Sequence, residues 1–263
     1  MSYLKIAIKA AKLAGEFIQQ SASSISTLKI EQKSANDFVS EVDRKAESII
    51  VDVLSSAYPD HTIVGEEHGA KVNQDTRRKW IVDPLDGTTN FLRSIPHYSV
   101  SIALLIDAQI EVAVVYDPSK DDLFYAEKGH GAFLNGREIS VNELASLQSG
   151  LYSTGIPFNG KGQQQIASFT NTMHELLDQQ TSGIRRLGSA ALDLAYVACG
   201  RYDGFWESNL KSWDIAAGIL LVTEAGGLVS DFQGGQDQLE SGNIVATGKN
   251  IHPDFVKITQ KDY

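Results

Sequence analysis

Two aspartates, Asp83 and Asp86, are three positions apart and directly precede a Gly-Thr-Thr turn within residues 80–91. The apolar residues 80–82 predict a buried strand. Pro84 disfavours helical geometry at Asp83 and removes one backbone donor, so we expect Asp83 at the end of that strand. Two carboxylates at a strand end are suited to binding a hard divalent cation.

The turn that follows is suited to an anionic ligand. Gly87 lets the backbone come close to a ligand, and the N–H groups of Gly87, Thr88 and Thr89 can open the next element toward an anion. Because carboxylates by themselves would repel a phosphate, divalent cations must lie between the aspartates and such a ligand. The segment therefore predicts a combined metal and phosphate site.

Two other interpretations of this segment remain open. An Asp-Gly pair between apolar runs is also the commonest signal of a short hairpin. Enzymes of the haloacid dehalogenase type form an aspartyl phosphate and separate their two aspartates by one residue, whereas two residues separate Asp83 from Asp86. That spacing changes the geometry between a nucleophile and a general acid.

Two further acidic segments favour the metal site. Glu66 and Glu67 follow a short β-branched stretch at residues 61–65, and Asp214 lies in the first turn of a helix predicted from Ser212. Each has an ordinary structural explanation, since negative charges stabilise helix N-termini and charges at strand ends are commonly solvated. Three weak signals of the same chemical kind together favour cation binding.

These motifs resemble the inositol monophosphatase family, with the greatest likeness to the bacterial inositol-1-monophosphatases. The resemblance extends over nearly the whole chain, and no metal-binding position departs from the family pattern. The motifs that carry it are SANDFVSEVD at 34–43, GEE at 65–67, DPLDGTTNF at 83–91, GSAALDLA at 188–195, WDIAAG at 213–218 and EAGG at 224–227.

The resemblance implies a set of ligands for Mg²⁺. Glu66, Asp83 and the carbonyl of Leu85 correspond to ligands of a first ion. Asp83, Asp86 and Asp214 correspond to ligands of a second. Glu66 would also help to hold a third, weaker ion with several waters, so two or three ions are expected. Inhibition by lithium is implied as well.

The resemblance also implies roles in catalysis and substrate binding. Thr88, oriented by Asp43, corresponds to the residue that positions and activates the attacking water, with Glu66 beside it. Backbone donors of Gly87 and Thr88 would hold the phosphate oxygens. The positions that contact hydroxyl groups of the sugar ring in the family are Asp86, Ala190, Glu207 and Asp214. From the sequence alone, an exposed surface position is an equally ordinary explanation for Glu207.

Composition and charge narrow the function classes. The chain has 263 residues, of which 42% are hydrophobic, and can bury a sizeable core. Its net charge of −10 argues against a dominant nucleic-acid contact. Residues 3–15 mix lysines into an apolar face and so are no signal peptide, and no apolar run is long enough to span a membrane. The lone Cys199 cannot form an internal disulfide, which favours a cytoplasmic location.

The histidines do not compete for the metal role. They show neither His-x-His nor His-x-x-x-His spacing, and so predict no zinc site. We interpret all six as ordinary surface or packing residues, with His97, soon after the acidic turn, as the one considered for substrate contact.

The pattern of elements predicts a layered α/β (α+β) fold. In the first half we expect helices, an antiparallel meander and a hairpin turn. They are the helices at 3–20 and 41–57, the strands at 98–106, 111–116 and 123–127, and the turn at Asn135-Gly136. In the second half helices at 162–179, 190–198 and 212–224 alternate with strands at 184–187, 204–206, 228–231 and 244–247. The family resemblance implies a five-layer αβαβα sandwich of the sugar-phosphatase type, with the active site between the two sheets.

A single phosphatase domain over residues 1–263 is expected. It divides loosely into an N-terminal half, 1–148, with the antiparallel sheet, and a C-terminal α/β half, 149–263. Arg185 and Arg186 could grip a phosphate. Adjacent residues on a strand point to opposite faces, however, which favours a subunit contact or a structural ion pair.

Two function classes remain. The first is a magnesium-dependent phosphomonoesterase that hydrolyses inositol-1-phosphate or a similar small polyol or sugar phosphate by direct attack of a metal-activated water, with a homodimer as the implied assembly. Fructose-1,6-bisphosphatase, NADP phosphatase and 3′-phosphoadenosine 5′-phosphate phosphatase activities are alternatives within this class. The second is a binding role in RNA synthesis, to which some bacterial relatives are linked, beside catalysis or instead of it. Contact with nucleic acid or the transcription machinery is left open, although the charge does not support it.

Overall fold

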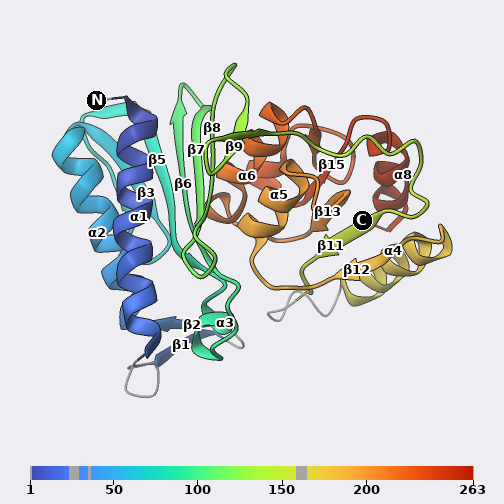
Figure 1. The fold of residues 1–263 in the computed structure, drawn as a ribbon, viewed down its shortest axis with the longest axis horizontal. Coiled ribbons are helices and arrows are strands. Elements are labelled where there is room, and N and C mark those ends of the chain that lie inside the picture. Colours follow the sequence, from blue (N-terminus) through green and yellow to red (C-terminus); the bar gives the residue numbers. More distant parts are fainter. Residues whose placement is uncertain (1, 24–29, 35–36, 158–164, 263) are drawn as a thin grey trace.

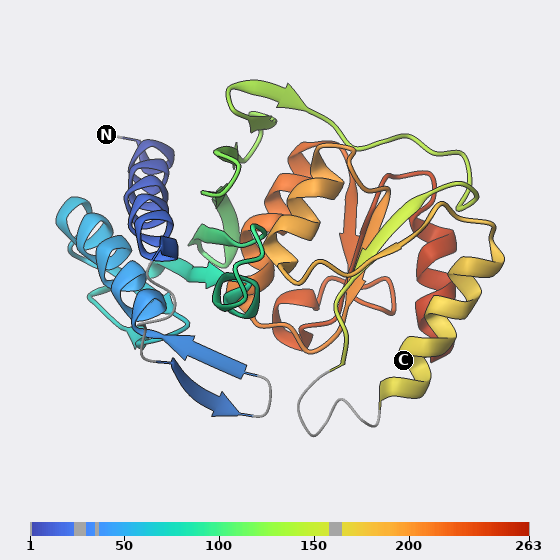
Figure 2. The same ribbon diagram turned by 60° about the horizontal axis from the view of Figure 1, so that its bottom comes forward.

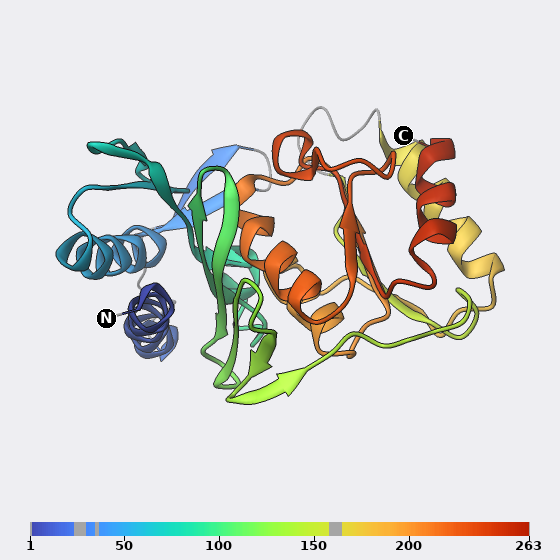
Figure 3. The ribbon, with the colours of Figure 1, turned by 90° about the horizontal axis from the view of Figure 1, so that it is seen from above.

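The computed structural model describes residues 2–23, 30–34, 37–157 and 165–262. Residues 35 and 36 of the motif at 34–43, and the first residues of the helix expected from 162, lie outside them. The described elements form five layers in the order helix, sheet, helix, sheet, helix (Figure 1, Figure 3). This order confirms the αβαβα sandwich. No described helix has the length and apolar character needed to cross a membrane.

The first sheet is built from eight described strands. They are β3 (His61–Gly65), β4 (Gly69–Lys71), β5 (Asp75–Asp86), β6 (Ser99–Ile106), β7 (Gln109–Asp117), β8 (Asp122–Glu127), β9 (Ala132–Leu134) and β10 (Arg137–Ile139). Their order across the sheet is β10-β9-β8-β7-β6-β5-β3-β4, and β3 pairs with β5 in parallel. Two amphipathic helices, α1 (Tyr3–Ser21) and α2 (Glu41–Ala57), cover the outer face with their apolar sides.

The second sheet is smaller and mixed. Its strands are β11 (Leu151–Thr154), β12 (Gly183–Arg185), β13 (Gly204–Glu207), β14 (Leu228–Ser230) and β15 (Ile244–Thr247). They lie in the order β12-β11-β13-β15-β14. The outer layer consists of α4 (Ile166–Asp178) and α8 (His252–Asp262), and Trp206 packs against Phe255 beneath it.

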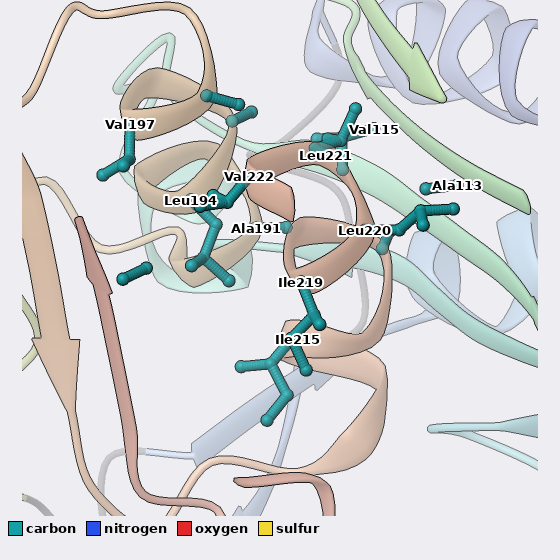
Figure 4. Packing of buried hydrophobic residues seen from close by; sticks show 14 of the residues in the cluster. Ala113, Val115, Ala191, Leu194, Val197, Ile215, Ile219, Leu220, Leu221 and Val222 are labelled. Atoms are coloured by element: carbon teal, nitrogen blue, oxygen red, sulfur yellow. The ribbon is translucent and has the colours of Figure 1, made fainter. Parts of the chain in front are cut away.

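The middle layer explains two unusually apolar helices. Every residue of α5 (Ala190–Ala198) is buried, and so is α6 (Ser212–Glu224) from Ile215 to Val222. A helix that is apolar on all sides must be covered on all sides, and here a sheet lies on either side of the pair (Figure 3). Leu194 of α5 and Ile219 of α6 lie in this layer (Figure 4). A Cβ at Gly218 would be 2.3 Å from Leu194 Cδ1, so the two helices are closely packed.

The remaining described elements are two strands and two short helices. β1 (Ile30–Ser34) and β2 (Asp37–Ser40) form a two-stranded antiparallel sheet of their own beside α2 (Figure 2). α3 (Thr88–Leu92) follows β5, and α7 (Gln238–Ser241) precedes β15.

The two halves of the chain share one apolar cluster. It contains Ile81 and Val115 from the first sheet together with Leu192 and Ile215 from the middle helices. The organisation as a single domain stays a prediction, and this shared cluster favours it.

Most expected elements are present, with some differences. The helices at 41–57, 190–198 and 212–224 and the meander are confirmed. The strand expected at 184–187 is Gly183–Arg185 instead, and β11 and α8 had no counterpart in the prediction. The expectation that Asp83 ends a strand is wrong, because β5 continues to Asp86.

A β-bulge at the end of β5 changes which way its aspartates point. Asp83 pairs with Ser101 of β6 and Asp86 pairs with Ser99, so three steps along β5 face two steps along β6. In a regular strand, residues three apart point to opposite faces. The extra residue reverses that parity, and it lies where Pro84 has no N–H to pair. Asp83 and Asp86 therefore face the same side of the sheet.

A glycine turn follows the bulge and begins α3. Gly87 has a φ of 94°, in the left-handed region that favours glycine. A Cβ there would be 3.1 Å from the carbonyl oxygen of His97 and 3.2 Å from that of Gly188. Both neighbours are backbone atoms and cannot rotate away. Gly87 is therefore required by both its φ and its surroundings.

We expect Gly87→Ala to lower the free energy of unfolding by more than the roughly 1–2 kcal/mol that a left-handed conformation costs an L residue, because the backbone contacts add to it. Urea denaturation measures the change. Gly136→Ala is the matched control, since Gly136 has a φ of 80° and open space around it. Equal losses for the two variants would show that the contacts around Gly87 do not matter.

Candidate active site

Asp83 is fixed by bonds within the bulge. It is 2% exposed, and its Oδ1 accepts the N–H of Leu85 at 3.0 Å. The carbonyl of Leu85 in turn accepts the hydroxyl of Thr88 at 3.0 Å. The bulge thus holds a carboxylate and a backbone carbonyl, both hard oxygen ligands, in a defined arrangement.

Asp86 is held by the N-terminus of α5. Its Oδ2 accepts the hydroxyl of Ser189 at 2.6 Å and the N–H of Ala191 at 2.8 Å. Ser189 is also the N-cap of α5. The unpaired N–H groups of a helix N-terminus stabilise a negative charge, so this contact orients Asp86 and ties β5 to the middle layer.

Thr88 and Asp43 form a pair of side chains from distant elements. Thr88 is the first residue of α3, and Asp43 is a buried residue in the first turn of α2. The Thr88 hydroxyl lies 2.8 Å from Asp43 Oδ1 and 3.0 Å from the Leu85 carbonyl. A hydroxyl has one hydrogen, and both of these neighbours are acceptors. The Thr88 hydroxyl therefore donates its hydrogen bond within the protein, and its oxygen can only accept a hydrogen bond from a water molecule.

Glu66 reaches the site from the neighbouring strand. It directly follows β3, and its N–H donates to the carbonyl of Val82 at 3.2 Å, which continues the parallel pairing of β3 with β5. This pairing brings Glu66 beside Asp83, and the charge of Glu66 contributes to raising the pKa of Asp83.

Asp214 comes from the first turn of α6. Its Oδ2 accepts the N–H of Lys211 at 2.6 Å. The hydroxyl of Ser101, opposite Asp83 on β6, donates to the carbonyl of Trp213 at 3.2 Å. This bond joins the start of α6 to the strand that pairs with the bulge.

Glu207 lies at the end of β13 and rests against bare backbone. A Cβ on Gly155 would overlap the carboxylate of Glu207, so a larger residue there would displace this carboxylate. Burial raises the pKa of Glu207 to about 8, and the charges of Asp214 and Asp86 contribute. Asp193 of α5 is a second buried carboxylate nearby, and burial and the charge of Glu207 raise its pKa well above the ordinary value.

The carboxylates oppose each other's ionisation. Burial raises the pKa of Asp83 well above its ordinary value, and neighbouring charges raise it further. Burial also raises the pKa of Asp214, with the charge of Asp86 adding to it. The pKa of Asp86 is raised by burial to about 6, although its hydrogen bonds to Ser189 and the α5 backbone act in the opposite direction. Cations stabilise such a group in its charged form.

This donor set suits magnesium better than an ion that needs a closed cage. Among the described residues, no group of three or more His, Cys, Asp or Glu side chains is arranged to hold a metal ion by itself. Magnesium keeps several waters and takes a few protein carboxylates plus substrate phosphate, so it needs no closed cage of protein ligands. The oxygens around Asp83 are of the hard type that it prefers.

The structure brings the sequence-predicted residues into one region, and it adds residues that sequence reasoning did not single out. Hydrogen bonds or electrostatic coupling connect Asp43 with Thr88, Asp86 with the start of α5, and Asp83 with the remaining acids. Ser189 and Asn90 are additions. The Asn90 amide donates to the carbonyls of His97 at 2.8 Å and Leu187 at 2.7 Å, and so joins α3 to the second half. Ser189 lies in the GSAALDLA motif, which was the available signal.

His97 is placed differently from the substrate contact considered for it. Its side chain is buried, 6% exposed, and packs edge-on against Tyr196. Burial lowers its pKa to about 4. A packing role in the middle layer fits these surroundings.

Comparisons with known proteins identify the family of this chain. The profile of the inositol monophosphatase family matches residues 1–262. The chain is 47% identical over 248 residues to the Nus factor SuhB of Escherichia coli, which covers 94% of this chain and 92% of that protein. It is 46% identical over 260 residues to an inositol-1-monophosphatase of Mesorhizobium japonicum, covering 98% and 96%.

Solved structures show the same fold. The extragenic suppressor protein suhB of Bartonella henselae superposes with a TM-score of 0.94 at 42% identity over 98% of each chain. An IMPase of Thermotoga maritima superposes with a TM-score of 0.87 at 36% identity over 99% of this chain and 98% of that one. Members of the matched family are phosphatases that generally use Mg²⁺. This chain therefore belongs to the inositol monophosphatase family and has the phosphatase function of that family.

Proposed function

We propose that this protein is a magnesium-dependent phosphomonoesterase that hydrolyses inositol-1-phosphate or a similar small polyol phosphate. The observation that carries the proposal is the group of mutually repelling carboxylates, buried at Asp83 and half-buried at the others, beside the Thr88–Asp43 pair. The first feature calls for cations, and the second can orient a water molecule.

The proposed ligands fall into two sets. Glu66, Asp83 and the Leu85 carbonyl would hold one ion, and Asp83, Asp86 and Asp214 would hold a second, with Glu66 assisting at a third. When bound, magnesium supplies positive charge that stabilises the phosphate oxygens and lowers the pKa of a coordinated water. The hydrogen bond from the Leu85 N–H holds the Asp83 carboxylate in place before a ligand binds. The hydrogen bond from the Ala191 N–H, at the start of α5, does the same for Asp86.

Thr88, Asp43 and Glu66 would prepare the water. Because the Thr88 hydroxyl donates within the protein, its oxygen accepts a hydrogen bond from water and fixes the direction of the water's lone pair. Glu66 would accept the water's proton directly or through a further hydrogen bond. With Asp83 and Asp86 committed as ligands, neither is a good nucleophile. Direct attack by water, with inversion at phosphorus and no phosphoenzyme, follows from this assignment.

Backbone donors and nearby side chains would bind the substrate. The N–H groups of Gly87 and Thr88 at the start of α3 can donate to phosphate oxygens. The ring hydroxyls would contact four residues around the phosphate. They are Asp86, Ala190, Glu207 and Asp214.

Several phosphate esters are candidate substrates for this function. Rates with inositol-1-phosphate, fructose-1,6-bisphosphate, NADP and 3′-phosphoadenosine 5′-phosphate, each at saturating Mg²⁺, separate the candidates. A rate with inositol-1-phosphate below those with the other three esters would replace the proposed substrate.

We expect Asp86→Asn to lower kcat/KM by at least about 100-fold, the upper range for losing one supporting group of a metal site. The Asn carbonyl oxygen can still accept the bonds from Ser189 and Ala191, so the melting temperature should change little. Asp254→Asn removes an exposed charge on α8 and is the control. Normal turnover of the Asp86 variant at saturating Mg²⁺ would rule out the ligand assignment.

Replacing Glu207 should affect discrimination among substrates more than the chemical step. Cations bound near Asp86 and Asp214 would favour the charged form of Glu207, and a charged group that accepts a hydrogen bond from a hydroxyl contributes roughly 1.5–3 kcal/mol. We therefore expect Glu207→Ala to reduce kcat/KM by about 10-fold or more for inositol-1-phosphate and by less for glycerol-2-phosphate. Glu207→Gln keeps one carbonyl acceptor and should lose less. Equal losses for both substrates would assign Glu207 to the chemistry or to folding.

A second role in RNA synthesis is favoured by the relatives called Nus factor SuhB, which are 46–49% identical to this chain. The net charge of −10 makes a protein of the transcription machinery a better partner than nucleic acid. For the phosphatase proposed above, we also propose a cytoplasmic location and inhibition by lithium.

We expect a homodimer in solution, because closed two-fold pairs are the commonest soluble assembly and the family resemblance implies one. Light scattering at micromolar concentration should give about twice the chain mass of 28.6 kDa. A single-chain mass across the concentration range would contradict the dimer.

A further inference from the structure

Glu47 is a buried acidic residue of α2 that the function above does not use. It is 0% exposed. It lies four residues after Asp43, so both side chains lie on the same face of the helix. Asp43 orients Thr88 from that face. The position of Glu47 raises the question of what it orients.

The carboxylate of Glu47 binds the turn between β3 and β4. Its Oε2 accepts the N–H of Glu67 at 2.8 Å. Its Oε1 accepts the N–H of His68 at 2.9 Å and lies 2.6 Å from Nδ1 of the same residue. Hydrogen bonds from backbone N–H groups to a charged carboxylate are stronger than neutral ones. Both oxygens of Glu47 are therefore used to hold two consecutive backbone amides.

The turn held in this way is the one that contains Glu66. β3 pairs with β4 from Gly65 to Gly69, so residues 66–68 form the connection. Gly65 is shaped to admit the carboxylate, because a Cβ there would be 2.4 Å from Glu47 Cδ. On its other side the turn is held by the bond from Glu66 N–H to Val82. Glu66 is thus fixed between α2 and β5.

We propose that Glu47 is a positioning residue that holds Glu66 in place for magnesium and for the attacking water. This inference rests on the proposed role of Glu66. One helix face then sets two parts of the site, with Asp43 acting on Thr88 and Glu47 acting on the backbone next to Glu66. Mutating a residue that holds a metal ligand in place typically lowers metal affinity by about 10- to 100-fold.

Glu47→Gln tests the inference with little change in shape. The Gln carbonyl can accept one amide, but its NH₂ group faces the other N–H, so one of the two bonds is lost. In the metal-free protein, amide exchange followed by NMR should speed up by about 10-fold or more at Glu67 or His68. The Mg²⁺ concentration for half-maximal activity should rise by about 10- to 100-fold. Asp52→Asn, an exposed acid on the same helix, is the charge-matched control.

Gly65→Ala provides an independent variant that keeps the Glu47 charge. The added methyl group would occupy the place of the carboxylate and displace it from the two amides. It should raise the half-saturating Mg²⁺ concentration in the same direction. Because both changes break the same contact, the double variant Glu47→Gln/Gly65→Ala should show less than the product of the two single effects.

The outcomes separate this inference from the proposed function. Unchanged exchange at Glu67 and His68, or unchanged Mg²⁺ dependence with faster exchange, would overturn the positioning role. If Glu66→Gln still raises the half-saturating Mg²⁺ concentration in that case, the proposed function stands. If wild-type activity does not depend on Mg²⁺, both fail. A lower melting temperature of Glu47→Gln, with unchanged half-saturation for Mg²⁺ and unchanged kcat/KM at saturating Mg²⁺, would assign Glu47 to folding alone.

Discussion

One β-bulge determines whether the side chains of Asp83 and Asp86 point to the same face of the sheet, and the site depends on that. Asp83 and Asp86 are an odd number of residues apart, and a regular strand would send them to opposite faces of the sheet. The extra residue at the end of β5 turns both toward the middle layer, where the N-termini of α5 and α6 begin. The two residues between Asp83 and Asp86 therefore distinguish this segment from the aspartyl-phosphate enzymes, which have one. With two intervening residues, a bulge is needed to bring both carboxylates to one face of the sheet.

The site concentrates negative charge in a place where the rest of the fold is apolar. Burial and mutual repulsion raise the pKa values of several of its acids, so the folded state holds these groups at a cost. Fixed donors offset part of that cost, including the Leu85 amide on Asp83 and the Ser189 hydroxyl on Asp86. The remainder is what a divalent cation would offset.

Local motifs made much of the site predictable, and long-range pairing made the rest unpredictable. The acids, the glycine turn and the two middle helices are visible in the sequence because composition and spacing are local properties. The bulge is not, since it depends on the register of β5 against β6. The same holds for Ser189, which contacts Asp86 across 103 residues, and for Asn90, which contacts Leu187 across 97. Strand β11 was missed because two of its four residues, Ser153 and Thr154, are polar although buried, and its pairing with β12 and β13 is long-range.

The bond between Asp86 and the start of α5 makes the site a late product of synthesis. An N-terminal fragment leaving the ribosome can contain Asp83, Asp86 and Thr88 without the helix ends that orient Asp86 or supply Asp214. Truncated chains therefore carry these residues without the groups that orient them. Catalytic competence therefore requires that translation has passed the start of α6 and that α5 and α6 have packed against the first sheet.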